Sequence, residues 1–357
     1  MSLRRTFLPA LGTSLAFSLG SGDALVFQPQ AGATLTKTFT TTSNLELDDL
    51  SLLVSGQDVG EMIGELAISI EQEGKVEVTD TYKAAAGGRP TELLRSFDAL
   101  TASVNFDISP APPSEMPQVE SASELEGKAV LFKWDPEEET YERSFPDGEG
   151  DEELLEGLEE DMDLRFLLPD KEVAVDDTWT VELSELGLIL MPGGDLRMMP
   201  EDAEMDREAM ERFAELFSGF TEKYKDQLEG ACTCTYKGMR EEGDVRVAEI
   251  AIELEVAAAL DLTQVLSEIA QQSLEESGAG DQVQFSFDSA DLSLDFEGSG
   301  TLLWNPATGL VHAFQIGGDV SLGLDLAVGI KAMGESQDMD ASLEMSGSME
   351  QVLETRQ

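Results

Sequence analysis

Histidine-based catalysis could use only one residue of this chain. Its 357 residues include one histidine, His312, and a Ser-His-Asp or Cys-His arrangement would have to use it. The sequence has no GxSxG nucleophile elbow, no glycine-rich phosphate loop before a helix and no HExxH zinc motif. A carboxylate-only glycosidase is an alternative because 73 acidic residues always provide pairs, but an aromatic content of 6% disfavours a sugar-stacking cleft. The sequence therefore predicts a non-enzyme without catalytic residues.

The segment around this histidine, TLLWNPATGLVHAFQI at residues 301–316, is typical of a β-hairpin. Asn305 and Pro306 suit the first positions of a turn, and Gly309 can close it in the left-handed conformation. A pairing symmetric about the middle of the turn would place Trp304 opposite residue 310 and His312 opposite residue 302. We expect His312 to lie on the apolar face of a strand, with residues 310, 314 and 316.

A second stretch, Trp134-Asp135-Pro136, repeats the order tryptophan, Asx, proline. A catalytic motif is not ordinarily duplicated without its partners, whereas a turn is. The repeat predicts two hairpins of similar build.

Cys232 and Cys234 are separated by one residue in EGACTCTYKG. In a strand two such residues lie on one face. They are either two small neighbouring side chains, which we favour, or a strained disulfide that an oxidising compartment would permit. Two thiolates are too few for a zinc site. We predict neither a metal nor a cofactor.

An acidic run, DGEGDEELLEGLEEDMD at residues 147–163, is compatible with a calcium loop or with a helix. Asp147, Glu149 and Asp151 have the spacing that starts a calcium loop. However, Glu152 stands where an EF-hand has glycine, and Leu158 where it has a bidentate glutamate. The apolar residues of the run recur at helical spacing. The sequence favours an exposed acidic helix.

The whole chain is strongly acidic, with 73 Asp and Glu against 22 Lys and Arg and a formal net charge of -51. Such a field repels phosphate backbones and anionic lipid surfaces. We therefore expect no nucleic-acid partner. A hydrated, aggregation-resistant surface is the simplest explanation of the charge, and a surface that binds cations or a basic partner is the alternative.

The N-terminus is typical of an export signal, residues 1–24. Arg4 and Arg5 form a positive start, residues 6–19 form a short apolar stretch, and Gly22-Asp23-Ala24 supplies small residues before a cut after Ala24. No stretch is apolar over the roughly 18 residues that a membrane-spanning helix needs. We expect the mature protein to be exported, to the periplasm or outside the cell.

Most of the mature chain alternates apolar and polar residues with period two, for example in residues 246–256 and 320–330. This alternation marks antiparallel strands with one face on a core and one in water. Glycines within the later stretch indicate strong curvature. We predict a mostly β fold, a large curved antiparallel sheet or half-barrel built as a meander. It forms a single domain over residues 25–357, with two similar halves, 25–185 and 186–357, as the alternative organisation.

Two segments show the three- and four-residue periodicity of amphipathic helices. The first, near residues 203–229, has a wide face of phenylalanine and methionine, and the second, near residues 261–277, begins with Asp261 as an N-cap. Both are predicted to pack on the sheet. The first either completes the core, which is the commoner role of such a helix, or covers the concave face as a lid.

The segment LPDKEVAVDDTWTVEL, residues 168–183, and the hairpin at 301–316 together resemble a group of uncharacterised exported bacterial β-proteins. That group has a V-x-V-G-D-x-W segment followed much later by a D-P-x-x-G hairpin. Here Asp176 replaces the glycine of the first segment, and Asn305 replaces the aspartate of the second. The matching residues are Val173, Val175, Asp177, Trp179, Pro306 and Gly309. The resemblance implies an exported antiparallel β-protein, loosely like the half-barrels that carry lipids or lipoproteins.

These observations predict an exported, non-enzymatic envelope protein that binds a hydrophobic small molecule or lipid in a β cup. The motivating feature is the wide apolar face of the first helix, whose methionines have adaptable side chains that suit a variable guest. The alternative is a structural or protein-interaction module of the envelope with an acidic surface. The sequence indicates no particular ligand-binding residue.

Overall fold

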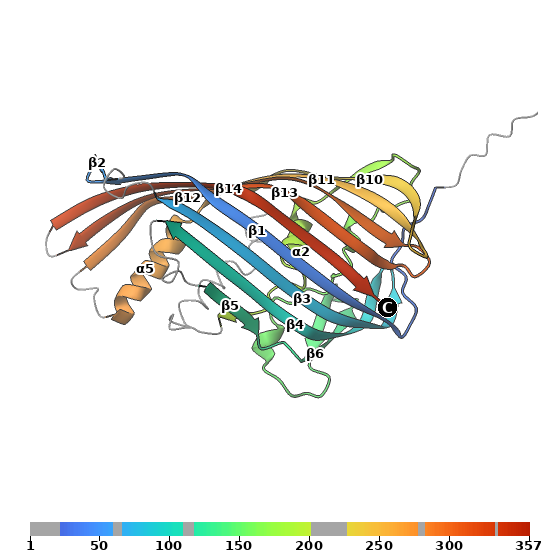
Figure 1. Ribbon diagram of the computed structural model, residues 1–357. Helices are drawn as coiled ribbons and strands as arrows, with labels where there is room; N and C mark the ends of the chain where they lie inside the picture. The colour runs from blue at the N-terminus through green and yellow to red at the C-terminus, as the bar shows by residue number, and fades with distance from the viewer. Residues whose placement is uncertain (1–21, 60–65, 110–117, 201–226, 278–282, 333–334) are drawn as a thin grey trace, which may run out of the picture.

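The computed structural model describes residues 22–59, 66–109, 118–200, 227–277, 283–332 and 335–357 (Figure 1). Its main element is one open antiparallel sheet of 14 strands, which confirms the predicted mostly β fold with a large curved sheet. The strands are β1 (Ala33–Val54), β2 (Gln57–Asp58), β3 (Ala67–Ala86), β4 (Arg89–Ser109), β5 (Gln118–Ser123), β6 (Ala129–Asp135), β7 (Thr140–Ser144), β8 (Thr178–Val181), β9 (Met198–Pro200), β10 (Leu228–Glu242), β11 (Val245–Asp261), β12 (Val283–Asn305), β13 (Leu310–Ala332) and β14 (Glu335–Arg356).

The sheet is a meander in which the first and last long strands meet. Its order is β7-β6-β4-β3-β1-β14-β13-β12-β11-β10-β8, so β14 pairs with β1 in the middle of the sheet (Figure 1). Thr36 lies opposite Arg356 at one end of this pair, and Val54 lies opposite Met339 at the other. Strands on both sides of residue 185 therefore belong to one continuous sheet.

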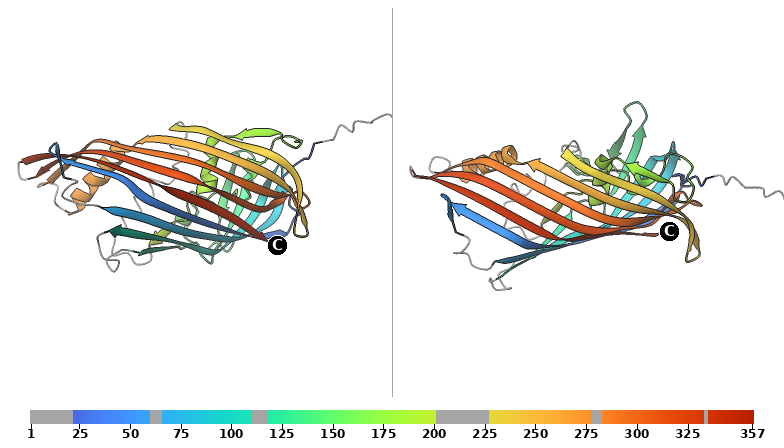
Figure 2. Two further views of the ribbon diagram at one scale, coloured as in Figure 1. Left: turned by 45° about the horizontal axis from the view of Figure 1, so that its top comes forward. Right: turned by 90° about the horizontal axis from the view of Figure 1, so that it is seen from above.

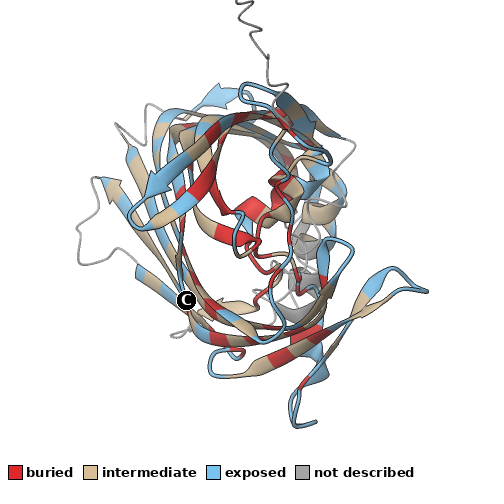
Figure 3. Cartoon of the chain, turned by 90° about the vertical axis from the view of Figure 1, so that its right-hand side faces the viewer, coloured by how far each residue is buried: buried red, intermediate tan, exposed pale blue. Residues whose placement is uncertain are grey.

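The long strands bend together into a trough (Figure 2). Strands β1, β3, β4, β12, β13 and β14 run for 20 to 23 residues, whereas strands of about 5 or 6 residues are commonest. Figure 3 looks along the trough, with the strands as its wall and buried segments inside it. We call the inner surface the concave face. On β11 Ile252 and Leu254 lie on this face, whereas Glu253 and Glu255 are exposed on the outer one.

The helices are few in the described residues. Helix α5 (Thr263–Ser277) confirms the second predicted helix, and the Asp261 carboxylate accepts a hydrogen bond from the backbone N–H of Thr263 at 2.9 Å, as an N-terminal cap does. The first predicted helix, near residues 203–229, lies outside the described residues except at its end, where β10 already begins at Leu228. A short helix, α2 (Gly187–Leu190), was not predicted. No helix of the described residues is long and apolar enough to cross a membrane.

The acidic run at residues 147–163 is not an exposed helix, and this prediction was wrong. A single 3-10 turn (Glu152–Leu155) opens it, and irregular chain follows. Its apolar residues Leu154, Leu155, Leu158 and Met162 are all buried in the main core. Their three- and four-residue spacing therefore does not come from a helix. It comes from an irregular chain that places these four side chains in the core. Of the carboxylates between them, Glu156 and Glu159 are exposed whereas Glu160 is buried. The described residues contain no cluster suited to a metal ion.

The hairpin around Asn305 forms, but its predicted register was wrong. Asn305 pairs with Leu310, so the loop has four residues, and Trp304 pairs with Val311. The Asn305 carbonyl accepts hydrogen bonds from the N–H groups of Thr308 and Gly309, at 3.3 and 2.9 Å. A bulge then leaves His312 without a partner residue on β12. The prediction that His312 lies on the apolar face assumed strict alternation of the strand residues. The bulge interrupts this alternation at His312.

The hairpin around Asp135 has the same build, which confirms the predicted pair of hairpins. Asp135 pairs with Thr140, again across four residues. In both turns the Asx side chain accepts a hydrogen bond from the N–H two residues later, at 2.7 Å from Glu137 and 3.0 Å from Ala307. In both, the last loop residue has positive φ, 53° at Glu139 and 66° at Gly309.

The start of the described chain is built into the fold. Asp23 forms an isolated bridge with Val173, with N–O distances of 2.8 and 3.0 Å, and its carboxylate accepts a hydrogen bond from the Tyr236 hydroxyl at 2.7 Å. Two residues that follow Asp23 in the chain, Leu25 and Phe27, are buried. A cut after Ala24 would remove the hydrogen bonds of Asp23 from the mature protein.

Candidate functional site

The strand registers align the inward residues of neighbouring strands into rows across the trough. One such row joins Leu100, Val76, Phe39, Leu353, Phe314 and Leu302, on β4, β3, β1, β14, β13 and β12. From this row toward the start of β1 the concave face is filled, and we call that part the closed half. The part toward the end of β1, from Leu45 to Val54, we call the open half.

The closed half is filled by the segments on either side of β8, residues 145–177 and 182–197, which we call the plug. Its side chains Leu158, Met162, Leu164 and Leu167 share one buried cluster with the sheet residues around Phe39. Figure 3 shows irregular chain with several buried stretches inside the trough. This half therefore contains the conventional hydrophobic core.

A network of buried charges ties the plug to the sheet. Lys37 Nζ lies 2.8 Å from Asp80 Oδ2 and 2.9 Å from Asp163 Oδ1, and all three side chains are 0% exposed. Arg95 donates two hydrogen bonds to the Asp80 carboxylate, at 2.8 and 2.9 Å. The Tyr82 hydroxyl donates to Asp163 at 2.7 Å. Because Asp163 belongs to the plug and the other residues to β1, β3 and β4, the network joins the two.

The charges of this network are matched to one another. Burial by itself raises the pKa of the Asp80 carboxyl, but the adjacent Arg95 and Lys37 charges outweigh burial and lower this pKa to about 2. Stability from Asp80 is therefore present above about pH 3.8, its unfolded value, and is lost as the pH falls through about 2. Arg95 also donates to the backbone carbonyls of Glu159 and Glu160 at 2.9 and 2.8 Å. Since no member is accessible, the network has a structural role.

Glu160 is a buried carboxyl of the plug whose hydrogen bonds are incomplete. Its carboxylate pairs with Arg165, yet one of its oxygens is buried without a hydrogen bond. Burial raises the pKa of Glu160 to about 7, against the attraction of Arg165 and with the repulsion of Asp161. An acid with a raised pKa favours the fold below its unfolded value, near 4.5, and this contribution is lost as the pH rises through about 7.

Next to the closed half, two rows of the concave face carry mostly small or neutral polar side chains. We call these rows the glycine belt. The first row joins Gly74, Thr41, Gln351, Ile316 and Gly300, and the second joins Gln72, Ser43, Met349, Gly318 and Gly298, on β3, β1, β14, β13 and β12.

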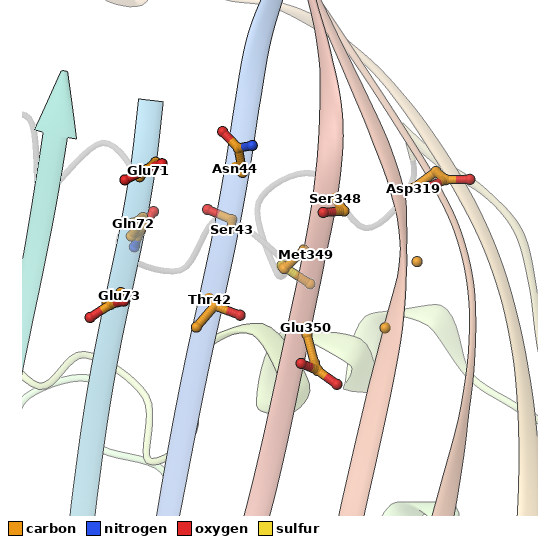
Figure 4. Close-up of a pocket in the computed structure, with 12 residues that line it drawn as sticks. Thr42, Ser43, Asn44, Glu71, Gln72, Glu73, Asp319, Ser348, Met349 and Glu350 are labelled. Atoms are coloured by element: carbon orange, nitrogen blue, oxygen red, sulfur yellow. The ribbon is translucent and has the colours of Figure 1, made fainter. Parts of the chain in front are cut away.

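Glycine is required in part of this region by close backbone approach. A Cβ on Gly318 would lie 2.3 Å from the Glu297 carbonyl oxygen, and one on Gly347, in the next row, 1.8 Å from that of Asn44. At the same level a shallow hollow of about 530 Å³ crosses β3, β1, β14 and β13 (Figure 4). Its lining includes Glu73 and Glu350 on the two sides of Thr42, so it is polar and acidic.

Beyond the belt, the open half presents rows of aliphatic side chains that are only half-buried. One row joins Ile68, Leu47, Met345, Leu322 and Leu294, and the next joins Leu50, Leu343, Leu324 and Leu292. In these two rows only Met345 is fully buried. In the row that borders the closed half, Phe39, Phe314 and Leu353 are 0 to 2% exposed. The same sheet therefore has a covered apolar half and an incompletely covered one.

Helix α5 covers one border of the open half. Leu262, the residue before α5, packs with Leu292 and Leu294 against Leu260, in a small cluster separate from the main core. Figure 1 shows α5 beneath the ends of the strands, on the concave side. From Leu45 to Val54 the open half extends about 30 Å along β1, and from β3 to β12 it extends about 19 Å, at the usual strand spacings.

The chemically reactive residues lie away from this surface. Cys232 and Cys234 are free, buried and on the concave face of β10, next to β8, as the interpretation as two small side chains predicts. His312 lies at the bulge of its hairpin, where its backbone carbonyl accepts a hydrogen bond from the Thr355 hydroxyl at 2.6 Å.

Sequence reasoning missed the buried charges, although a signal was present. Lys37 occupies an inward position between Leu35 and Phe39, and Asp80 one between Val78 and Tyr82. Arg95 likewise lies between two buried apolar residues. A charged residue in an apolar register on three adjacent strands indicates a buried network. No protein-family model and no curated protein matches this chain, so its function has to be argued from the concave face itself.

Proposed function

We propose that this is an exported, non-enzymatic protein that holds the aliphatic chains of a lipid on the open half of its concave face. The observation that carries the proposal is the contrast between the two halves of one sheet. Residues such as Leu322 and Leu324 have the same inward register as the core residue Phe314, yet they remain half-buried. A concave, mostly apolar surface with a few polar groups at its border is the usual form of a small-molecule site.

The composition of the open half favours a flexible chain over a ring. Its two central rows consist of leucine, isoleucine and methionine, and its aromatic residues Phe106 and Phe296 lie in the row next to the belt. Ring ligands are usually held by aromatic stacking, which is absent from those two rows. The inner strands of the sheet have no free backbone edge here, so a peptide could not add a strand to them.

The apolar area also suits more than one chain. Burying about ten methylene groups contributes about 8 kcal/mol, and association costs about 4 kcal/mol or more. A single acyl chain would then bind weakly, near the millimolar range. Two chains side by side fit the width of about 19 Å and would bind much more tightly.

Extraction and binding measurements test this proposal. Mass spectrometry of an organic extract of the purified protein should find co-purified acyl lipid, and a pyrene-labelled diacyl lipid should bind saturably. The variant Leu322→Glu should abolish binding because it puts a charge among the aliphatic rows. Its neighbour Ser321 is exposed on the outer face, so Ser321→Glu is the matched control. Absence of both co-purified lipid and saturable binding would refute the proposal.

A second candidate function is a structural or interaction module of the envelope. The acidic hollow on the sheet favours it, with Glu71, Glu73, Asp319 and Glu350 in its lining. In this case calcium should raise the melting temperature saturably at low millimolar concentration. If sodium at equal ionic strength raises it as much, the effect is charge screening.

A further inference from the structure

One side-chain amide nitrogen on the concave face is buried without a hydrogen bond among the described residues. Gln351 is 1% exposed, and its side-chain nitrogen Nε2 makes no hydrogen bond within the part of the chain that the structure describes. A buried amide without its hydrogen bonds costs about 1–3 kcal/mol. By register Gln351 belongs to the glycine belt, opposite Thr41 on β1 and Ile316 on β13. A donor is therefore held at the border between the belt and the core.

The belt places small residues and further polar groups beside this donor. Gly74 and Gly300 are the outer members of the row that contains Gln351, and neither has a side chain. Thr41 and Ser43 bring hydroxyl groups to the concave face of β1, and both are half-buried. The open half begins in the next row, at Leu45. Polar donors thus lie at one end of the aliphatic surface.

None of the belt residues is charged, and the nearby buried cations are already neutralised. Lys37 lies on the same face of β1 as Thr41 but is held by Asp80 and Asp163 at 2.8 and 2.9 Å. Arg95 is held by Asp80. A carboxylate or phosphate on the belt would lose its water without gaining a counter-ion, which is costly. The net charge of -51 adds repulsion.

We infer that the lipid carried by this protein has an uncharged, hydrogen-bond-accepting head, such as the ester carbonyls of a diacylglycerol, which lies on the glycine belt beside Gln351. This inference rests on the proposed function, because the acyl chains of such a lipid would occupy the open half. The Gln351 amide would donate to an ester carbonyl oxygen, and the hydroxyls of Thr41 and Ser43 would solvate the rest of the head. Free fatty acids and anionic phospholipids would be disfavoured.

A set of pyrene-labelled probes with the same acyl chain tests the inference on the full-length protein at pH 8. The probes are a diacylglycerol, a phosphatidic acid with the same two chains, a free fatty acid and a pyrene-labelled alkane without a head. We expect the diacylglycerol to bind at least tenfold more tightly than the phosphatidic acid. A phosphatidic acid that binds equally or more tightly would overturn the inference and leave the proposed function intact. Failure of all four probes to bind would instead refute the proposed function.

A variant of Gln351 then tests whether this residue binds the lipid head. Gln351→Leu removes the amide at nearly constant volume, and it should weaken diacylglycerol binding about 2- to 12-fold, the range of one net hydrogen bond. Binding of the alkane should stay unchanged. Gln315 lies on the outer face and donates to Glu350 at 2.6 Å, so Gln315→Leu is the control and should change neither. Equal diacylglycerol binding by Gln351→Leu and the natural protein would overturn the role of Gln351.

Discussion

The strongest test of how the plug is held is the replacement of Lys37 by methionine. Lys37 is the only cation within 4 Å of Asp163 among the described residues, at 2.9 Å, and both side chains are fully buried. In Lys37→Met, Asp80 keeps its two hydrogen bonds from Arg95. Asp163 keeps only the Tyr82 hydroxyl as a side-chain donor. The variant therefore contains a buried carboxylate without a counter-charge.

The loss of unfolding free energy expected for Lys37→Met follows from the burial of Asp163. Removing one partner of a buried ion pair costs about 3–5 kcal/mol, because the other charge stays buried and unpaired. The exposed pair of Lys75 with Glu77, at 3.1 Å and with the lysine 46% exposed, provides the control. Lys75→Met should cost about 1 kcal/mol or less. The two variants remove the same charge and differ in burial.

Urea denaturation followed by tryptophan fluorescence measures both costs, and a double variant isolates the interaction. In Lys37→Met with Asp163→Asn the buried anion is removed together with its cation. The double variant should therefore be about 2 kcal/mol more stable than Lys37→Met alone. A loss of about 1 kcal/mol or less for Lys37→Met, or strictly additive effects in the double variant, would refute the reasoning.

Three further changes have expected outcomes. Glu160→Gln should abolish a loss of unfolding free energy of up to about 3 kcal/mol between pH 5 and 8, measured as the difference from the natural protein, because the raised pKa makes protonated Glu160 favour the fold. Gly347→Ala should prevent folding or lower the melting temperature by more than 10 °C, whereas Gly74→Ala, whose new Cβ would be 3.9 Å from its nearest neighbour, should fold normally by circular dichroism. A chain without residues 1–24 should be about 2–3 kcal/mol less stable to urea than one without residues 1–21, because Asp23 makes three hydrogen bonds, and equal stability would contradict this.

The strands could be predicted from the sequence because each obeys a local rule. Alternation in β11 and β13 shows directly which residues face the core, and Asx-Pro pairs mark two of the turns. The register of the hairpin at Asn305 could not be predicted because it depends on a bulge. No pattern in the side chains around His312 indicates this bulge. Alternation therefore specifies the faces of a strand better than its pairing.

The plug could not be predicted because its burial is non-local. Leu154, Leu155, Leu158 and Met162 have helical spacing, yet they are buried in an irregular chain against strands that are distant in sequence. One contact that holds that chain is the ion pair of Asp163 with Lys37. Neither residue reveals its partner alone, since the two are separated by more than a hundred positions and both occur among many charged residues.

The two unusual groups of inward polar residues have opposite consequences for the concave face. Lys37, Asp80, Arg95 and Asp163 satisfy one another and close their half by fixing the plug. Gln351 has an amide nitrogen without a partner, at the border where the plug ends and the half-buried aliphatic rows begin. Most buried donors have a protein partner, as Lys37 and Arg95 do, whereas the Gln351 amide nitrogen has none among the described residues. Its position next to the open half is therefore better explained by an acceptor that arrives with a ligand.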